Sequence, residues 1–269
     1  MNQQNLIIPF LVVCTLIINS CAKDASYQDP CTDNSLIRSV KSGEIDNQQL
    51  TYNANCQVNE YIQEFMYKKY SYNDQNQLKK VEIVVSTNPA SCFMQPGATG
   101  EVFTDPRKAK PGQNYTFEYN ASGNLIKKSV FFLRDGTMQL TSYQTYEFQN
   151  NLISAIRIFN TQDKLMQKYV YTYENGNVSQ EKYYSVENGT TEKLLSSHSY
   201  EYDDRLNPYK VLVSEGQPGI FTNDNNILSD TVKYYHNAEV NEYVTNYTYE
   251  YNAAGFPNKV NNMNYIYGN

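Results

Sequence analysis

Residues 169–178 read Tyr-Val-Tyr-Thr-Tyr-Glu-Asn-Gly-Asn-Val, and this stretch decides the fold class. Tyrosines fill every second position of its first half, a period of two that is typical of a half-exposed β-strand. Asn175 and Gly176 follow, and both residue types accept the positive φ that a tight hairpin requires. The stretch therefore predicts a strand, a turn and the start of a return strand.

The same arrangement recurs along the chain. An aromatic–x–aromatic triplet occupies residues 70–72, 117–119, 146–148, 171–173, 200–202 and 249–251, and the steps between the last aromatics are 47, 29, 25, 29 and 49 residues. Such spacing favours a repeat architecture. Turn sequences follow at 120–124, 174–177 and 252–255, and we expect return strands at 125–132, 152–159 and 178–184.

The repeats predict an all-β protein, a large curved antiparallel meander of long β-hairpins that is either open or closed into a barrel-like sheet. No helical period is present in residues 110–269, and a short helix within 46–69 stays an alternative. We expect aromatic pairs across neighbouring strands to stabilise the sheet by about 0.2–1 kcal/mol each. Tyr suits this role because its ring can be buried while its hydroxyl stays in water.

Charged residues follow the same pattern. The middle residue of four triplets is Glu118, Glu147, Glu201 or Glu250, and the expected return strands carry cations: Lys127, Lys128, Arg157, Lys182, Lys210 and Lys259. We interpret these residues as a solvated sheet face whose cross-strand ion pairs fix the register, each contributing little to stability. The alternative is a charged binding strip.

The N-terminal residues indicate where the protein resides. Residues 6–18 are almost all apolar, too short for a span of about 20 residues but typical of the apolar part of a secretory signal. The preceding five residues lack the usual Lys or Arg. Ile18-Asn19-Ser20-Cys21 resembles the lipobox of bacterial lipoproteins, which implies cleavage before Cys21 and acylation of that cysteine. A plain secretory signal with a coincidental cysteine is the alternative.

This reading divides the chain into three parts: a lipoprotein signal peptide (1–20), a tether and N-terminal segment (21–49), and a sheet domain (50–269). Two or three acyl chains hold a soluble domain on a bilayer, so the expected partner is a membrane. We therefore expect an outer-membrane lipoprotein that faces the periplasm or the cell surface. Lys23 followed by Asp24 is similar to a surface-export signal of some Gram-negative lipoproteins, although a short solvated tether explains it equally well.

Three further cysteines follow the proposed anchor: Cys31, Cys56 and Cys92. An exported protein can form disulfides, and an odd number allows at most one bridge within the chain. The sequence leaves the pair open. There is no Cys-x-x-Cys, and His198 and His236 are distant in sequence, so we expect no metal site. Residues 223–226 lack the spacing of a calcium loop and are interpreted as a loose turn.

Residues 171–178, together with 117–125 and 249–257, look like tyrosine–aspartate (YD/RHS-type) repeats. Over about residues 50–269 the chain resembles a family of uncharacterised lipoproteins whose domain of unknown function has a porin-like fold. The resemblance implies a strongly curved antiparallel sheet, a barrel or half-barrel, and no established catalytic residue. Phe148 departs from the motif, because it replaces the terminal Tyr and the turn after it lacks Gly.

Composition limits the function. The net charge is −6 and the pI about 5.1, which argues against a nucleic-acid partner. No nucleophile-elbow, phosphate-loop or zinc-protease motif is present, and we expect neither an enzyme nor a cofactor. We expect a non-catalytic module that binds a glycan, a peptide or an envelope protein on an aromatic sheet face: Tyr115, Phe117, Tyr119, Tyr169, Tyr171, Tyr173, Tyr247, Tyr249 and Tyr251.

Two alternatives remain open. The protein could be a purely structural or interaction protein of the outer membrane. It could also be a hydrolase that uses carboxylates such as Glu118 or Asp204. Separately, Thr231 in Asp230-Thr231-Val232 resembles the acceptor for O-glycosylation in some bacteria.

Overall fold

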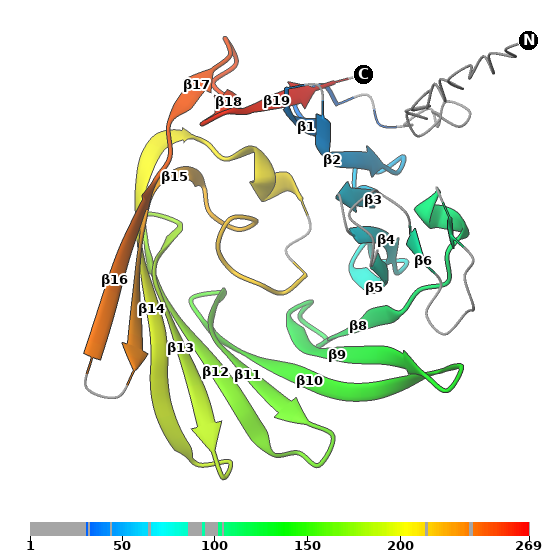
Figure 1. The fold of residues 1–269 in the computed structure, drawn as a ribbon, viewed down its shortest axis with the longest axis vertical. Coiled ribbons are helices and arrows are strands. Elements are labelled where there is room, and N and C mark those ends of the chain that lie inside the picture. The colour runs from blue at the N-terminus through cyan, green and yellow to red at the C-terminus, as the bar shows by residue number, and fades with distance from the viewer. Residues whose placement is uncertain are drawn as a thin grey trace, which may run out of the picture.

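The computed structural model describes residues 31, 33–43, 45–63, 66–85, 93–94, 102–103, 105–212, 215–236 and 239–268. These residues form an antiparallel 17-stranded sheet and a separate two-stranded sheet (Figure 1). The predicted all-β curved meander is confirmed. Within the described ranges, no helix has the length and apolar content of a membrane-spanning segment.

The elements up to residue 134 are β1 (Ile37–Ser42), β2 (Ile45–Tyr52), β3 (Val58–Gln63), β4 (Met66–Tyr72), β5 (Leu78–Val85), β6 (Phe93–Met94), β7 (Val102–Phe103), the 3₁₀ helix η1 (Pro106–Lys108), β8 (Gln113–Tyr119) and β9 (Leu125–Arg134). The remaining elements are β10 (Thr137–Gln149), β11 (Leu152–Asn160), β12 (Leu165–Glu174), β13 (Asn177–Glu187), β14 (Thr191–Leu206), the 3₁₀ helix η2 (Pro208–Val211), β15 (Asn225–His236), β16 (Glu239–Asn246), β17 (Tyr249–Tyr251), β18 (Pro257–Val260) and β19 (Met263–Tyr267). The three expected return strands are β9, β11 and β13.

Strands that are consecutive in the sequence are hydrogen-bonded neighbours almost throughout. β5 pairs with β8, and β1 pairs with both β2 and β19, so the first and last strands lie side by side (Figure 1). Of the described strands, β16 pairs only with β15 and β17 only with β18. The curved sheet is therefore open rather than closed into a barrel.

The structure excludes the helical alternative for the N-terminal part. Residues 46–69 form β2, β3 and β4 rather than a helix, because their apolar residues pair across strands of the sheet. β1 and most of β2 precede residue 50, so the N-terminal segment 21–49 also contributes strands to the sheet.

A single turn design recurs at five hairpins. The side-chain Oδ1 of an Asn accepts hydrogen bonds from the backbone N–H groups two and four residues further on, at Asn53, Asn73, Asn120, Asn160 and Asn252. The third residue after each Asn has a positive φ, as at Gly123 (82°) and Asn76 (61°). Asn side chains that bond to their own backbone stabilise turns locally, which explains why the turns could be predicted.

At most hairpins the ladder shifts by one residue at a bulge, whereas the β3–β4 and β15–β16 pairings keep a continuous register. Tyr119 pairs with Leu125 while Glu118 pairs with Lys127, so Ile126 is the extra residue. The same shift follows the last aromatic of β2, β4, β10, β12, β14 and β17. A bulge reverses which of the following residues face inward, and it leaves a backbone group without its ladder partner.

Tyrosine hydroxyls bond to backbone at these bulges. Tyr72, Tyr119 and Tyr173 donate to the carbonyls of Val58, Leu78 and Ile153 at 2.7, 2.9 and 2.8 Å. Tyr52, Tyr202, Tyr249 and Tyr267 make equivalent bonds to Ile37, Val178, Ile227 and Pro257. The expectation that these hydroxyls stay in water was wrong: each satisfies a carbonyl of the preceding hairpin, which buried backbone requires.

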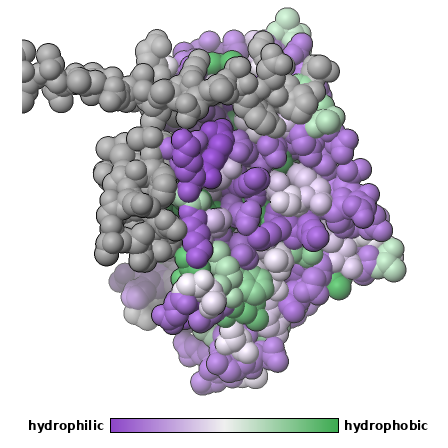
Figure 2. Space-filling model, turned by 90° about the vertical axis from the view of Figure 1, so that its right-hand side faces the viewer, coloured by the Kyte–Doolittle hydropathy of each residue, from purple (hydrophilic) through white to green (hydrophobic). Residues whose placement is uncertain are grey.

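The outer face carries three of the predicted cross-strand ion pairs, and among the described residues neither Glu201 nor Lys182 forms one. Lys127 lies 3.7 Å from Glu118, Arg157 lies 2.6 Å from Glu147, and Lys259 lies 2.9 Å from Glu250. Two of the expected cations are elsewhere: Lys128 faces inward, opposite Phe117, and Lys210 lies in η2 beside Asp224. Figure 2 shows the side of the molecule to the right of Figure 1, where hydrophilic residues predominate and apolar residues form small areas.

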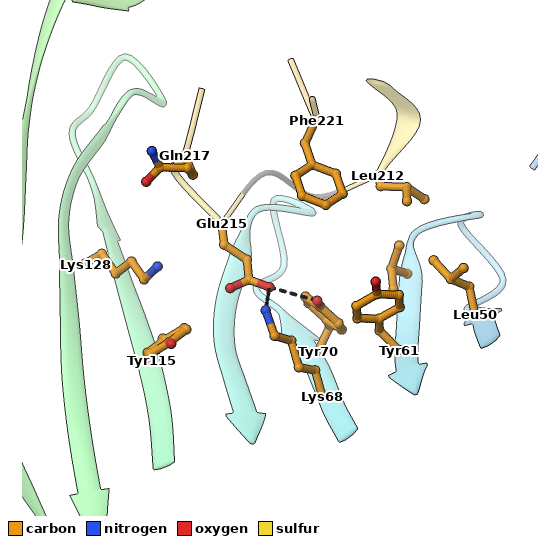
Figure 3. A pocket seen from close by; sticks show the side chains of 11 residues that line it. Leu50, Tyr61, Lys68, Tyr70, Tyr115, Lys128, Leu212, Glu215, Gln217 and Phe221 are labelled. Atoms are coloured by element: carbon orange, nitrogen blue, oxygen red, sulfur yellow. Dashed lines mark hydrogen bonds and ion pairs between the residues drawn. The ribbon is translucent and has the colours of Figure 1, made fainter. Parts of the chain in front are cut away.

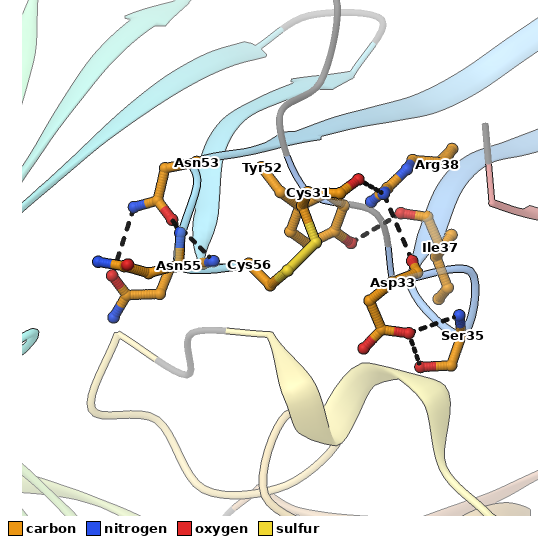
Figure 4. The surroundings of a disulfide bond; sticks show 10 residues. Cys31, Asp33, Ser35, Ile37, Arg38, Tyr52, Asn53, Asn55 and Cys56 are labelled. Atoms are coloured by element: carbon orange, nitrogen blue, oxygen red, sulfur yellow. Dashed lines mark hydrogen bonds between the residues drawn. A yellow bond between two sulfur atoms is a disulfide. The ribbon is translucent and has the colours of Figure 1, made fainter.

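A disulfide joins Cys31 to Cys56, the third residue after Asn53 in the turn that follows β2 (Figure 4). The bridge attaches residue 31 to the first hairpin of the sheet. The Arg38 guanidinium lies over the Tyr52 ring at 4.4 Å and donates to the Cys31 carbonyl at 3.0 Å. Cys92, the third candidate, lies outside the described residues.

Candidate functional site: an internal cavity

Residues 207–224, which connect β14 to β15, lie inside the curve of the sheet (Figure 1). We call them the inner segment; residues 207–212 and 215–224 are described. Asn207 donates to the carbonyls of Ile220 and Asn223 at 2.6 and 2.9 Å. Asn223 is 1% exposed and accepts a hydrogen bond from the Val178 N–H at 2.9 Å. The loose turn expected at 223–226 is thus a buried anchor of the inner segment.

Apolar side chains of the inner segment pack on the concave face of the sheet. Tyr209 and Leu212 are buried in the same core as Leu50 and Val81. The Tyr209 ring also meets the ring of Tyr265, from β19, edge to face at 5.9 Å. This part of the concave face is therefore covered by the protein's own chain, where the sequence suggested an open aromatic surface.

A cavity of about 280 Å³ remains between the inner segment and strands β2, β3, β4, β8 and β9 (Figure 3). Four of its lining side chains are charged or amide groups, four are aromatic and three are aliphatic: Lys68, Lys128, Glu215 and Gln217; Tyr61, Tyr70, Tyr115 and Phe221; Leu50, Val58 and Leu212. Its volume is near the lower end of the range of about 300–1,000 Å³ for small-molecule sites.

Glu215 attaches the inner segment to the sheet at this cavity. Its Oε1 accepts hydrogen bonds from Lys68 Nζ at 2.7 Å and from the Tyr70 hydroxyl at 2.8 Å. The carboxylate and ammonium side chains are only 12% and 16% exposed. Glu215 has a φ of 52°, which is uncommon for a residue with a side chain. Its side-chain contacts offset this unfavourable backbone geometry.

Gly216 lets the inner segment approach the sheet closely. Its φ is 80°, and a Cβ at this position would clash with the Tyr146 hydroxyl and lie 2.7 Å from Leu125. On the other side of it, Gln217 Nε2 donates to the Tyr171 hydroxyl at 2.6 Å. Contacts from 215 to 217 thus fix the carboxylate of Glu215 over the cavity.

Lys128 is the second cation of the cavity and lies in β9. The residue is 9% exposed, and its Nζ lies 4.2 Å from the centre of the Tyr115 ring. In the described part of the chain, no carboxylate lies within ion-pair distance of this ammonium. Burial lowers the pKa of Lys128 to about 8, while Glu215 acts to raise it and Lys68 to lower it.

The tyrosines at the cavity keep neutral hydroxyls. Burial raises the pKa of Tyr61, Tyr70 and Tyr115 above the ordinary value. The Tyr115 hydroxyl accepts a hydrogen bond from Gln113 at 3.2 Å. The cavity therefore offers a carboxylate paired with one ammonium, a second ammonium, an amide and neutral phenols around an apolar floor.

The nine aromatics expected to form a ligand face have different environments. Tyr115 lines the cavity, Phe117 is buried in the core, and Tyr119 lines a second cavity of about 260 Å³ next to Glu215. Tyr169 stacks on Tyr171 and Tyr183, at 6.5 and 4.8 Å between ring centres. Most of the set has a structural contact of its own, so the fold does not bring the nine together as one surface.

The C-terminal members of that set also bond within the protein. Tyr249 and Tyr251 stack at 5.8 Å. Tyr249 donates to the Ile227 carbonyl, and the Tyr251 hydroxyl bonds to Asp203. Tyr247 is half-buried, and its backbone N–H extends the ladder to Leu228.

The remaining candidates lie away from the cavity. Glu118 is exposed and paired with Lys127, and Asp204 is exposed beside Arg205. Thr231 is half-buried in β15, between β14 and β16. Cys21 lies outside the described residues, as do the expected signal peptide and residues 22–30 of the expected tether.

A second polar group lies on the concave face. Tyr171, Glu181 and His198 are directly opposite one another on β12, β13 and β14. His198 Nδ1 is 2.9 Å from Asp230, and this hydrogen bond raises the pKa of His198. Burial raises the pKa of Glu181. From the sequence, His198 was considered as a metal ligand, and this carboxylate partner was not predicted.

Comparison with known proteins supports the fold. No protein-family model and no curated protein matches the sequence. Among solved structures, a porin-like protein from Bacteroides vulgatus is similar over 87% of this chain and 98% of its own, with 13% identity and a TM-score of 0.50. A porin-like protein from Bacteroides uniformis is similar over 86% of this chain and 97% of its own, with 12% identity and a TM-score of 0.45. A DUF3836 family protein from Bacteroides vulgatus is similar over 31% of this chain and 91% of its own, with 15% identity and a TM-score of 0.27.

The first of these similarities extends over nearly the whole of both chains, and at this identity it concerns the fold alone. The expected porin-like sheet architecture is supported. That similarity does not describe the cavity, which is lined by the inner segment and the strands that face it. Glu215 and Gln217 were not predicted from the sequence because residues 207–224 belong to no repeat. The unusual length of this connection between two hairpin strands was the feature that could have marked the segment as a candidate.

Proposed function

We propose that this protein is a lipid-anchored cell-envelope protein that binds a small polar ligand, without chemical turnover, in the internal cavity. The observation that carries the proposal is the convergence of Lys68, Lys128, Glu215 and Gln217 on one cavity between aromatic rings (Figure 3). Ligand sites combine mostly apolar walls with a few fixed polar groups. A segment serving only to fill the sheet would be expected to bury apolar side chains there instead.

The lining favours a sugar-sized ligand. Tyr61, Tyr70 and Tyr115 offer ring faces and hydroxyls, which suit a molecule with apolar faces and polar edges. Gln217 provides both a donor and an acceptor. A cavity of about 280 Å³ corresponds to roughly nine water molecules of about 30 Å³ each. A monosaccharide or an amino acid fits this space better than a folded protein partner does.

Binding is tested by saturation-transfer NMR on the full-length chain in detergent. The panel contains neutral monosaccharides, uronic acids, amino acids and short peptides. We expect at least one class to bind the wild type and to lose at least tenfold in affinity in Gln217→Ala. The control is Tyr234→Ala, because Tyr234 is 49% exposed on a different part of the sheet. If no member of the panel binds, or if both variants bind like the wild type, the cavity is not a ligand site.

The lipid anchor rests on the lipobox-like sequence that ends at Cys21. Cells that express the protein and are fed an alkyne fatty acid should label it, and the Cys21→Ser variant should remain unlabelled. The matched control is Cys14→Ser, which changes a cysteine of the expected signal peptide and should be labelled like the wild type. Labelling that persists in Cys21→Ser would contradict the assignment.

A further inference from the structure

The charges that line the cavity do not balance. Glu215 pairs with Lys68 at 2.7 Å, which leaves Lys128 as a second cation without a carboxylate in ion-pair distance among the described residues. An ammonium has three donors and no acceptor. The ring of Tyr115 at 4.2 Å and that of Phe117 at 5.9 Å contact it only through their faces. Burying a charge without a hydrogen-bonded partner is unfavourable.

Lys128 is also aimed at the cavity by the fold. The bulge after Tyr119 pairs Lys127 with Glu118 on the outer face and Lys128 with Phe117 on the inner face. Lys128 then points toward the space below Gln217, next to Tyr115 (Figure 3). The apolar side chains of the cavity lie beyond Glu215, at Leu212 and Phe221. The polar and apolar parts of the cavity therefore lie on opposite sides of the Glu215 carboxylate.

We propose that the ligand is an anion of monosaccharide size, a uronic acid, whose carboxylate binds Lys128 while its ring lies against the tyrosines. This inference rests on the proposed function and specifies the ligand class. The carboxylate would supply the hydrogen-bond acceptor that Lys128 lacks. Gln217 and Glu215 would bind the ring hydroxyls, as an amide and a carboxylate commonly do. A neutral sugar of the same shape would cover the Lys128 ammonium without supplying a charged acceptor.

The pH dependence of binding follows from the groups that face Lys128. These are Glu215 and Lys68, which pair with each other, and the hydroxyls of Tyr61, Tyr70 and Tyr115, whose pKa values burial raises. The pKa of Lys128 is lowered to about 8, so its ammonium loses its proton before those hydroxyls ionise. Affinity should be constant between about pH 5 and pH 8, where the uronic acid is ionised and Lys128 is protonated, and it should fall by about tenfold per pH unit above that range.

The test compares D-galacturonate with its methyl ester, which has the same ring but no charge. Binding to the full-length chain is measured by isothermal titration calorimetry at pH 7 and pH 9. We expect the acid to bind at least tenfold more tightly than the ester at pH 7. Lys128→Met should abolish that preference. Lys127→Met should retain it, since Lys127 is the adjacent residue on the outer face.

A stability measurement separates binding from a structural role. Removing an unpaired buried cation should leave the denaturation midpoint of Lys128→Met unchanged or raise it, whereas loss of a structural ion pair would lower it. A lowered midpoint together with an unchanged acid-to-ester ratio would overturn the inference. Equal affinity for acid and ester in the wild type would also overturn it and would leave the proposed binding function intact. If neither is bound while another panel member is, the uronic acid assignment is wrong; if no ligand is bound, both proposals fail.

Discussion

Replacing Glu215 by Gln should lower the free energy of unfolding by about 3 kcal/mol. The substitution removes the carboxylate that pairs with Lys68 and leaves two ammonium groups, those of Lys68 and Lys128, facing one cavity. Both members of the Glu215–Lys68 pair are largely buried, and removal of one partner from a buried pair leaves an uncompensated charge. The φ of 52° at Glu215 adds to the effect, because the contacts that offset it are weakened.

The measurement is urea denaturation at neutral pH, followed by tyrosine fluorescence and circular dichroism. Glu250→Gln is the matched control, because its pair with Lys259 is exposed and should change stability by less than about 1 kcal/mol. Adding Lys68→Met to Glu215→Gln should recover part of the loss, since it removes one of the two uncompensated cations. Equal effects of Glu215→Gln and Glu250→Gln would show that the inner segment is not held by this carboxylate.

Hydrogen exchange would locate the consequence of losing Glu215. If the inner segment detaches before the sheet unfolds, amides in residues 207–224 should exchange faster in Glu215→Gln while amides of β12 and β13 stay protected. Segments can open locally with a lower free energy than global unfolding. Faster exchange that is confined to β12 and β13 would contradict this picture, because those strands do not contain the substituted residue.

Loss of the Cys31–Cys56 disulfide should lower the free energy of unfolding by about 3–4 kcal/mol. The two cysteines are 25 residues apart, and a loop of that length gives this value in the chain-entropy model. Cys56 has a φ of 57°, so the double variant Cys31→Ser and Cys56→Asn is preferred: Asn76 occupies the equivalent turn position with a φ of 61°. The turn then keeps a residue that tolerates its geometry, and the measured loss reports the bridge.

The comparison is made by urea denaturation with and without a reducing agent. Reduction should destabilise the wild type to the level of the double variant, and it should leave the double variant unchanged. A double variant as stable as the oxidised wild type would show that the bridge contributes nothing to folding. Because the bridge fixes residue 31 to the first hairpin, its loss should also increase exchange in β1 and β2.

Features within one hairpin could be predicted from the sequence. The turn after Tyr119 and the ion pair between Glu118 and Lys127 involve residues that are close in sequence, so local propensity and register determine them. The assignment of Lys128 to the same face failed. A bulge follows the turn and shifts the alternation by one residue, which brings Lys128 inside. The recurring Asn turn indicates such a bulge. A prediction that assumes a strict period of two along the strand does not take the bulge into account.

Contacts between distant segments could not be predicted in the same way. Sequence alone left the partner of Cys56 open, and it gave no reason to place Glu215 beside Lys68, 147 residues earlier. Nothing local specifies that residues 207–224 enter the sheet, because their buried Asn side chains look like ordinary turn residues. The role of the tyrosine hydroxyls was also hidden, since each bonds to the carbonyl of a preceding hairpin.

By itself, the sequence determined an all-β chain of aromatic hairpins with a charged outer face, because strand period and turn chemistry are properties of neighbouring residues. Only the tertiary structure decided which residues share the interior. The open, curved sheet surrounds the inner segment, and this arrangement brings Glu215, Lys68 and Lys128 to one cavity. The electrostatic interactions among these three side chains depend on the distances between them, which a periodic sequence pattern does not determine.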